Sequence, residues 1–130
     1  MPEAKSRSYY LEEFAGTPES NPDSEYKAFC FGRVGSRSQA MITFIKKDDY
    51  VEAISYANLN RIWSSNISNE IRLDFGGRIV TIEGARLNDL FNYIRMNRCS
   101  EVIEQSTYSA MEAQESSPTV TTITIKNAGS

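Results

Sequence analysis

The chain has 130 residues, of which 40% are hydrophobic and 24% are charged, and its formal net charge is −3. This length suits one domain, and this composition argues against both a disordered chain and a membrane-spanning one. The pI of about 5.0 argues against a dedicated nucleic-acid-binding protein, whose binding domain usually carries a large basic excess.

The first 26 residues differ in composition from the rest of the chain. They carry six acidic and two basic side chains, and residues 15–25 are mostly small and polar with two prolines. Such a stretch buries too little apolar surface to offset the entropy lost on ordering. We therefore expect a flexible acidic N-terminal arm over residues 1–26 and a folded domain over residues 27–106. Because the arm has no apolar core like that of a secretory signal, we expect a cytoplasmic protein.

Three short β-strands are the first elements predicted within the domain. Met41–Ile45 and Tyr50–Tyr56 are β-prone runs separated by the polar residues 46–49, a pattern that predicts a hairpin. Leu59–Trp63 is followed by the polar residues Ser64–Asn66, so we expect a third short strand there.

A second hairpin is predicted around Gly76 and Gly77, which can adopt the positive φ angles of a tight two-residue turn. Every second residue on either side of this turn is apolar, as in strands with one buried face. These apolar residues are Ile71, Leu73, Phe75, Val80 and Ile82.

After Gly84 the apolar spacing changes from every second residue to every third or fourth. This period predicts an α-helix whose buried stripe consists of Leu87, Leu90, Phe91 and Ile94. The later pair Val102–Ile103 is expected to add an edge strand after the helix. Four or five antiparallel strands in a meander, with one packed amphipathic helix, place the domain in the α+β class.

Residues 107–130 are expected to form a polar linker and a β-prone C-terminal tail. The stretch 109–118 is polar, whereas Thr119–Ile125 is rich in β-branched residues, which suit a pleated strand. Two interpretations of Thr119–Ile125 stay open at this point. It is either a last strand docked on the sheet or an exposed tail.

One pattern resembles that of a group of short bacterial proteins. It consists of the run Val80–Gly84 followed by Leu87, Leu90, Arg98 and Val102–Glu104. The resemblance covers roughly residues 40–105 and implies no activity and no binding residues. The expected fold is also similar to pleckstrin-homology-like domains, but those domains normally end with their helix, whereas β-prone residues follow it here.

The sequence offers few residues suited to catalysis. It contains no histidine, which removes the commonest general base near neutral pH and the usual zinc ligand. Cys30 and Cys99 alone are too few for a structural zinc site, and two reduced thiols are the simpler expectation. The basic glycine-rich stretch 32–37 lacks the spacing of a phosphate-binding loop, and the acidic residues in 48–52 are typical of a solvated turn. We therefore expect no enzyme, no metal site and no cofactor.

By elimination, the sequence favours a non-catalytic protein-interaction module or adaptor, which binds another protein or a second copy of itself. The candidate binding residues are Tyr56, Arg61, Trp63 and Arg72, because aromatic and arginine side chains are enriched at interfaces. Ordinary packing in the core or on the surface is the competing interpretation of each.

The alternative function is weak binding of single-stranded nucleic acid through the central part of the chain. Residues 27–99 hold eleven basic and seven acidic side chains, and basic groups near a tryptophan are typical of a single-strand groove. The acidic ends of the chain would oppose a phosphate backbone, so nucleic acid is the less expected partner.

Overall fold

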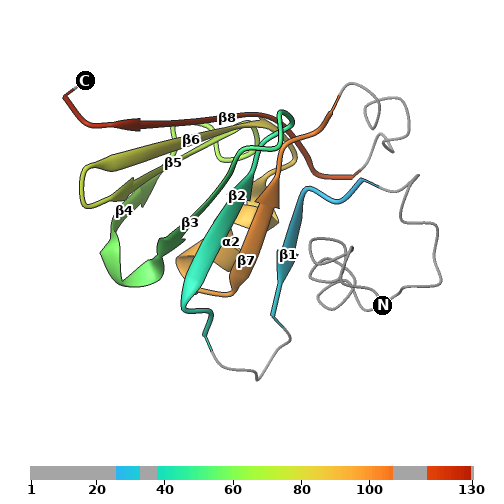
Figure 1. The fold of residues 1–130 in the computed structure, drawn as a ribbon. Helices are drawn as coiled ribbons and strands as arrows, with labels where there is room; N and C mark the ends of the chain where they lie inside the picture. Colours follow the sequence, from blue (N-terminus) through green and yellow to red (C-terminus); the bar gives the residue numbers. More distant parts are fainter. Residues whose placement is uncertain (1–25, 33–37, 107–116, 130) are drawn as a thin grey trace, which may run out of the picture.

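Eight β-strands, one α-helix and one short 3-10 helix make up the described part of the chain, residues 26–32, 38–106 and 117–129 of this computed structural model (Figure 1). The strands are β1 (Phe29–Phe31), β2 (Met41–Ile45), β3 (Val51–Ser55), β4 (Leu59–Trp63), β5 (Glu70–Phe75), β6 (Arg78–Ala85), β7 (Cys99–Ile103) and β8 (Thr119–Asn127). The α-helix is α2 (Asn88–Arg95), and the 3-10 helix η2 (Tyr56–Asn58) joins β3 to β4.

Four of the strands form sheet A, in the order β1-β7-β2-β3. The β2–β3 pair is the hairpin predicted across residues 46–49, with Met41 opposite Ser55 and Ile45 opposite Val51. β7 lies between β1 and β2 and runs parallel to β2, because the chain crosses over through α2 before it returns to the sheet.

The other four strands form sheet B, in the order β4-β5-β6-β8. β5 and β6 are joined by Gly76 and Gly77, whose φ angles of 65° and 101° belong to the left-handed region that the predicted two-residue turn requires. β8 then pairs antiparallel with β6 along most of its length, from Arg78 opposite Asn127 to Ala85 opposite Thr119. Thr119–Ile125, for which two interpretations were open, is thus part of a strand docked on sheet B.

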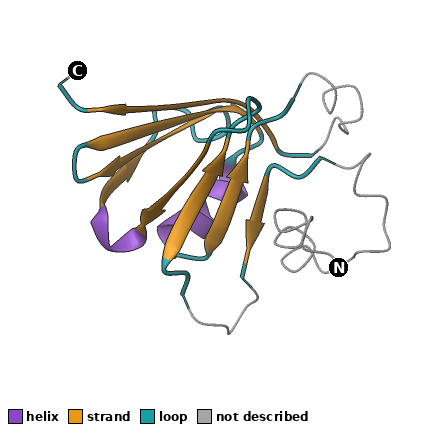
Figure 2. Ribbon diagram, viewed as in Figure 1, coloured by secondary structure: helices purple, strands orange, loops and turns teal. Residues whose placement is uncertain are grey.

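The hydrophobic core lies between the inner faces of the two sheets. Phe44 of sheet A meets Phe75 of sheet B edge to face, with ring centroids 6.2 Å apart. α2 covers the same core and lies behind β2 and β7 in the view of Figure 2. Of the predicted helical stripe, Leu87, Leu90 and Ile94 are fully buried, whereas Phe91 is only partly buried at the edge of the core.

The predicted α+β class is confirmed. The predicted antiparallel meander of four or five strands is wrong in its arrangement, because the described strands form two sheets and β7 runs parallel to β2. The strand expected after the helix exists as β7, but it lies inside sheet A and is not an edge strand. β1 was not predicted, since a three-residue strand has no recognisable period. The predicted arm over residues 1–26, the loop 32–37 and the linker 109–118 fall almost wholly outside the described residues and stay predictions.

Candidate protein interface

Three of the four candidate binding residues lie together on the outer face of sheet B. Arg61 and Trp63 are two residues apart on β4, so their side chains point to the same side of the sheet. The guanidinium carbon of Arg61 lies 4.4 Å from the centroid of the Trp63 ring, within the range of a cation–π contact. Arg72 of β5 is the cross-strand neighbour of Trp63 and shares its face, with the Arg72 guanidinium bound to Glu70.

We define the outer face of sheet B by the alternate residues of its strands that point away from the core. On β5 these are Glu70, Arg72 and Asp74, because the intervening residues are buried. The cross-strand register continues the face with Arg61 and Trp63 on β4, Ile79, Thr81 and Glu83 on β6, and Thr122, Thr124 and Lys126 on β8.

Charge on the outer face of sheet B is balanced. Its basic residues are Arg61, Arg72 and Lys126, and its acidic residues are Glu70, Asp74 and Glu83. Arg72 forms an ion pair with Glu70 at 2.9 Å, and Arg61 lies directly across from Asp74. The acidic members were missed at the sequence level, although the alternation of Glu70, Arg72 and Asp74 along one predicted strand placed them on the same side.

Tyr56, the fourth candidate, lies elsewhere. Its side chain is only 6% exposed, and its hydroxyl donates a 2.8 Å hydrogen bond to the backbone carbonyl of Cys99. Burial raises the pKa of this phenol above its ordinary value. Tyr56 therefore joins η2 to β7 inside the fold and contributes nothing to the outer face of sheet B.

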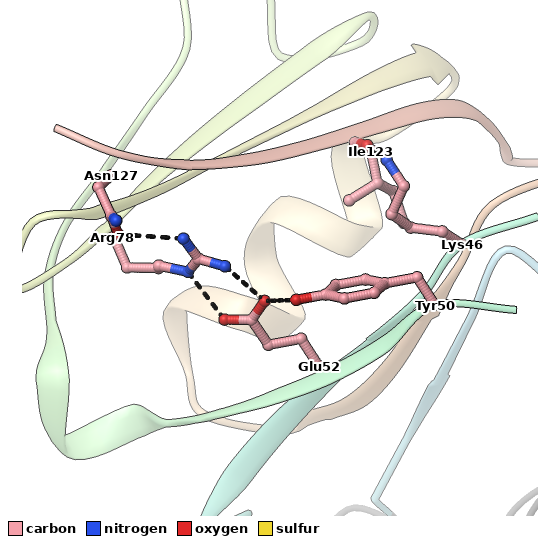
Figure 3. A network of polar contacts seen from close by, with 6 residues as sticks. All are labelled: Lys46, Tyr50, Glu52, Arg78, Ile123 and Asn127. Carbon is pink, nitrogen blue, oxygen red and sulfur yellow. Dashed lines mark hydrogen bonds and ion pairs between the residues drawn. The ribbon is translucent and has the colours of Figure 1, made fainter. Parts of the chain in front are cut away.

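The free edge of β8 is closed by groups from sheet A. The carboxylate of Glu104 accepts a 2.7 Å hydrogen bond from the backbone N–H of Ile123. The ammonium group of Lys46, drawn beside Ile123 in Figure 3, donates a 2.6 Å bond to the Ile123 carbonyl. Near the start of β8, the Tyr26 hydroxyl accepts a 2.9 Å bond from the N–H of Val120. These contacts satisfy the edge groups that a neighbouring strand would otherwise pair.

A second polar network joins the two sheets near β3. Arg78 of β6 donates two 2.8 Å hydrogen bonds to the carboxylate of Glu52 and a 3.0 Å bond to the side chain of Asn127 (Figure 3). The hydroxyl of Tyr50 donates to the same carboxylate at 2.7 Å. The bidentate contact with Arg78 lowers the pKa of Glu52 below its ordinary value. This network links β3 of sheet A to β6 of sheet B, and it holds the Arg78 guanidinium on Glu52.

Two basic residues of the central part of the chain, Lys46 and Arg78, do not form a groove with Trp63. They bind Ile123 and Glu52 and lie away from the outer face of sheet B. On the outer face of sheet B, the cations among the described residues are Arg61, Arg72 and Lys126, and both Arg61 and Arg72 have an acidic neighbour there. A phosphate backbone would meet a face with no net positive charge.

The two cysteines are free and buried on neighbouring strands. Burial raises the pKa of the Cys30 thiol to about 12 and that of Cys99 above its ordinary value, so both are protonated at neutral pH. A protonated thiol is a poor nucleophile and a poor metal ligand. Within the described residues, no three His, Cys, Asp or Glu side chains gather in a way that could hold a metal ion.

A smaller apolar surface lies between β1 and α2. The rings of Phe31 and Tyr93 are stacked, with centroids 4.1 Å apart, and Phe29 contacts the Tyr93 ring at 5.8 Å. Phe31 is 42% exposed, so this cluster is open to solvent on one side. It lies at the β1 edge of sheet A and not on sheet B, and the Arg98 guanidinium donates a 3.0 Å hydrogen bond to the carbonyl of the neighbouring Gly32.

Comparison with known proteins adds no relative. No protein-family model matches the chain, and neither curated proteins nor solved structures give a match. No helix in the described ranges has both the length and the apolar character that crossing a membrane requires.

Proposed function

We propose that this protein is a non-catalytic protein-interaction module whose binding surface is the outer face of sheet B around Trp63. The observation that carries the proposal is the Arg61–Trp63–Arg72 group. It places a tryptophan and two arginines, the residue types that dominate binding energy at protein interfaces, side by side on a solvent-facing sheet.

The balanced charge of this face favours a protein partner over a nucleic acid. Three cations and three anions share the face across the four strands, with Glu70 and Glu83 directly opposite each other, so a partner with its own mixed charges finds complementary positions. A single-stranded nucleic acid needs a basic track beside its stacking platform, and Lys46 and Arg78 are committed elsewhere. Weak single-strand binding stays the alternative, because Trp63 with two neighbouring guanidinium groups could still stack a base.

The location and the lack of catalysis belong to the same proposal. Free, buried thiols at Cys30 and Cys99 are consistent with a reducing compartment, so we place the module in the cytoplasm. The perturbed pKa values fall on tyrosines and thiols with structural contacts, and on the Glu52–Arg78 pair. These groups do not converge on one open site, and an interaction function therefore remains the better proposal.

The test is affinity capture from the native cell, followed by mass spectrometry, with matched variants of the chain. The wild-type protein is compared with Trp63→Ala, which removes the indole, and with Thr124→Ala, which truncates a side chain on the same face at its far edge. We expect specific partners to be captured by wild type and Thr124→Ala and lost with Trp63→Ala, since a hot-spot truncation costs about 2 kcal/mol or more. Identical capture by all three proteins would contradict the proposal.

A further inference from the structure

The two long edges of sheet B differ in whether side chains bind their backbone groups. The free edge of β8 is occupied at Val120 and Ile123 by side chains of Tyr26, Lys46 and Glu104. At the other edge, the described part of the chain places neither a strand nor a capping side chain beside β4. An open edge strand pairs readily with another strand, so the β4 edge is where a partner strand can bind sheet B.

The direction of the β4 backbone groups follows from the ladder of sheet B. Alternate residues of a strand turn their N–H and C=O groups to opposite sides, and those of Ile123 point away from β6, toward Glu104 and Lys46. The cross-strand registers carry this alternation from β8 to β4. The backbone N–H and C=O groups of Thr81 face β8, those of Arg72 face β4 and those of Trp63 face β5. Ile62 lies next to Trp63, so its N–H and C=O point outward to the open edge.

We propose that the partner on this edge is a second copy of the chain, paired antiparallel through β4 about a two-fold axis at Ile62. This inference rests on the proposed function and names the partner of the same surface. Ile62 is the outward-facing residue within the regular part of β4, so the axis there lets each Ile62 N–H bind the other copy's Ile62 carbonyl.

The argument for a second copy is that the outer face is complementary to itself in this register. The two-fold axis sets Arg61 directly opposite the second copy's Trp63, in a non-hydrogen-bonded pair, where side chains approach most closely. Across the joined sheets, each row then reads Arg72, Trp63, the second copy's Arg61 and the second copy's Asp74. Trp63 lies between two cations, Arg61 lies between an indole and a carboxylate, and no like charges stand side by side.

The shared ladder is short, which determines where the affinity must come from. A register shift between Leu59 and Arg61 limits the regular part of β4 to three residues. Few backbone hydrogen bonds can therefore form between copies, and the row of Arg61 and Trp63 side chains supplies much of the binding. We expect a reversible dimer that is sensitive to each of these two side chains.

Sedimentation velocity of the full chain over a wide concentration range tests the dimer. Two charge reversals are compared. Arg61→Glu replaces the cation opposite the second copy's Trp63 with a carboxylate, and Lys126→Glu makes the same charge change at the far edge of the face. We expect wild type and Lys126→Glu to dimerise alike, and Arg61→Glu and Trp63→Ala to weaken the dimer at least about tenfold. Circular dichroism checks that each variant is folded, and Arg61 is exposed, so its substitution leaves the core intact.

Hydrogen exchange measured against protein concentration tests the register. The amide of Ile62 should become protected as the dimer forms, whereas that of Ile125, which faces outward on β8, should not change. A chain that stays monomeric at its highest soluble concentration would overturn the inference. So would a dimer indifferent to Arg61→Glu, or one that leaves the Ile62 amide unprotected. A monomer that still captures a different protein through Trp63 overturns the self-pairing and leaves the proposed function standing.

Discussion

Glu104, just after β7, accepts a hydrogen bond from the backbone N–H of Ile123 in the middle of β8, and its other carboxylate oxygen accepts from the N–H of Lys47 at 2.8 Å. One buried carboxylate thus links the two sheets where no strand of sheet A pairs with β8 by backbone hydrogen bonds. Without this contact the edge of β8 would present an unpaired amide inside the protein.

Replacing Glu104 with alanine should destabilise the fold strongly. The buried N–H of Ile123 and the part-buried N–H of Lys47 would both lose their acceptor, and an unsatisfied buried donor costs about 1–3 kcal/mol. We expect the free energy of unfolding, measured by urea denaturation, to fall by about 2–5 kcal/mol. Glu83→Ala, on the exposed outer face of sheet B, is the matched control and should change it by less than about 0.5 kcal/mol.

Leu90 and Phe91 of α2 should respond differently to truncation. Leu90 is fully buried, so Leu90→Ala should cost about 2–5 kcal/mol in the free energy of unfolding. Phe91 lies at the margin of the core, so Phe91→Ala should cost less than the 3–5 kcal/mol usual for a buried phenylalanine. A loss below about 1 kcal/mol at both positions would mean that the helix does not cover the core.

Local patterns predicted the parts of the fold that depend on neighbours in sequence. The two hairpins and the helical stripe around Leu90 follow from residue spacing and from the Gly76–Gly77 turn, so they were predictable. The place of β7 depends on contacts between segments more than fifty residues apart, which no local period encodes. Arg61 and Trp63 were selected by residue type, because arginine and tryptophan are enriched at interfaces.

Tyr56 shows where the same reasoning fails. Ile54 and Tyr56 are both buried and lie two residues apart, so the alternation of β3 extends to Tyr56 at the start of η2 and places its side chain in the core. The contact that holds it there, the carbonyl of Cys99, is 43 residues away. Aromatic character alone did not separate this core tyrosine from the surface residue Trp63.

The Glu52–Arg78 pair predicts how stability depends on pH. Arg78 lowers the pKa of Glu52 below 4.5, so in the acid range the folded protein binds fewer protons here than the unfolded chain does. The stabilisation is complete above pH 4.5 and is lost as the pH falls through the lower, folded pKa. Glu52→Gln should therefore be less stable than wild type at neutral pH, and the difference should shrink in acid. Urea denaturation over a pH series measures this, with Glu83→Gln as the control.

Gly84 of β6 is a position where any side chain should be rejected. A Cβ atom there would lie 1.8 Å from the backbone carbonyl oxygen of Thr119 on β8, at the register shift between the two strands. Since backbone must move to relieve the contact, Gly84→Ala should lower the free energy of unfolding by about 3 kcal/mol or more. Gly76→Asn is the contrast, because Gly76 has open space around it and asparagine tolerates its φ of 65°. Thermal unfolding should give a clearly lower Tm for Gly84→Ala than for Gly76→Asn.

The last prediction separates the two proposed classes of partner by salt. Phosphate contacts release counterions, so the affinity of a nucleic-acid complex falls steeply as salt is added, whereas an apolar protein interface depends on salt much less. Trp63 is the only tryptophan, so its fluorescence reports directly on the outer face of sheet B. Because the charges of that face cancel, we expect a single-stranded oligonucleotide to leave this fluorescence unchanged at physiological salt.

Lys126→Glu and Glu83→Gln make this titration decisive, since both change the charge of the face without touching Trp63. One outcome is micromolar oligonucleotide binding that weakens with added salt, strengthens with Glu83→Gln and weakens with Lys126→Glu. In that case the face binds phosphate, and the nucleic-acid alternative replaces the protein-interaction proposal. The other outcome is an indole fluorescence change that depends on protein concentration, persists at moderate salt and is lost with Arg61→Glu. Trp63 then lies at a protein interface, because the charge beside it controls binding and the net charge of the face does not.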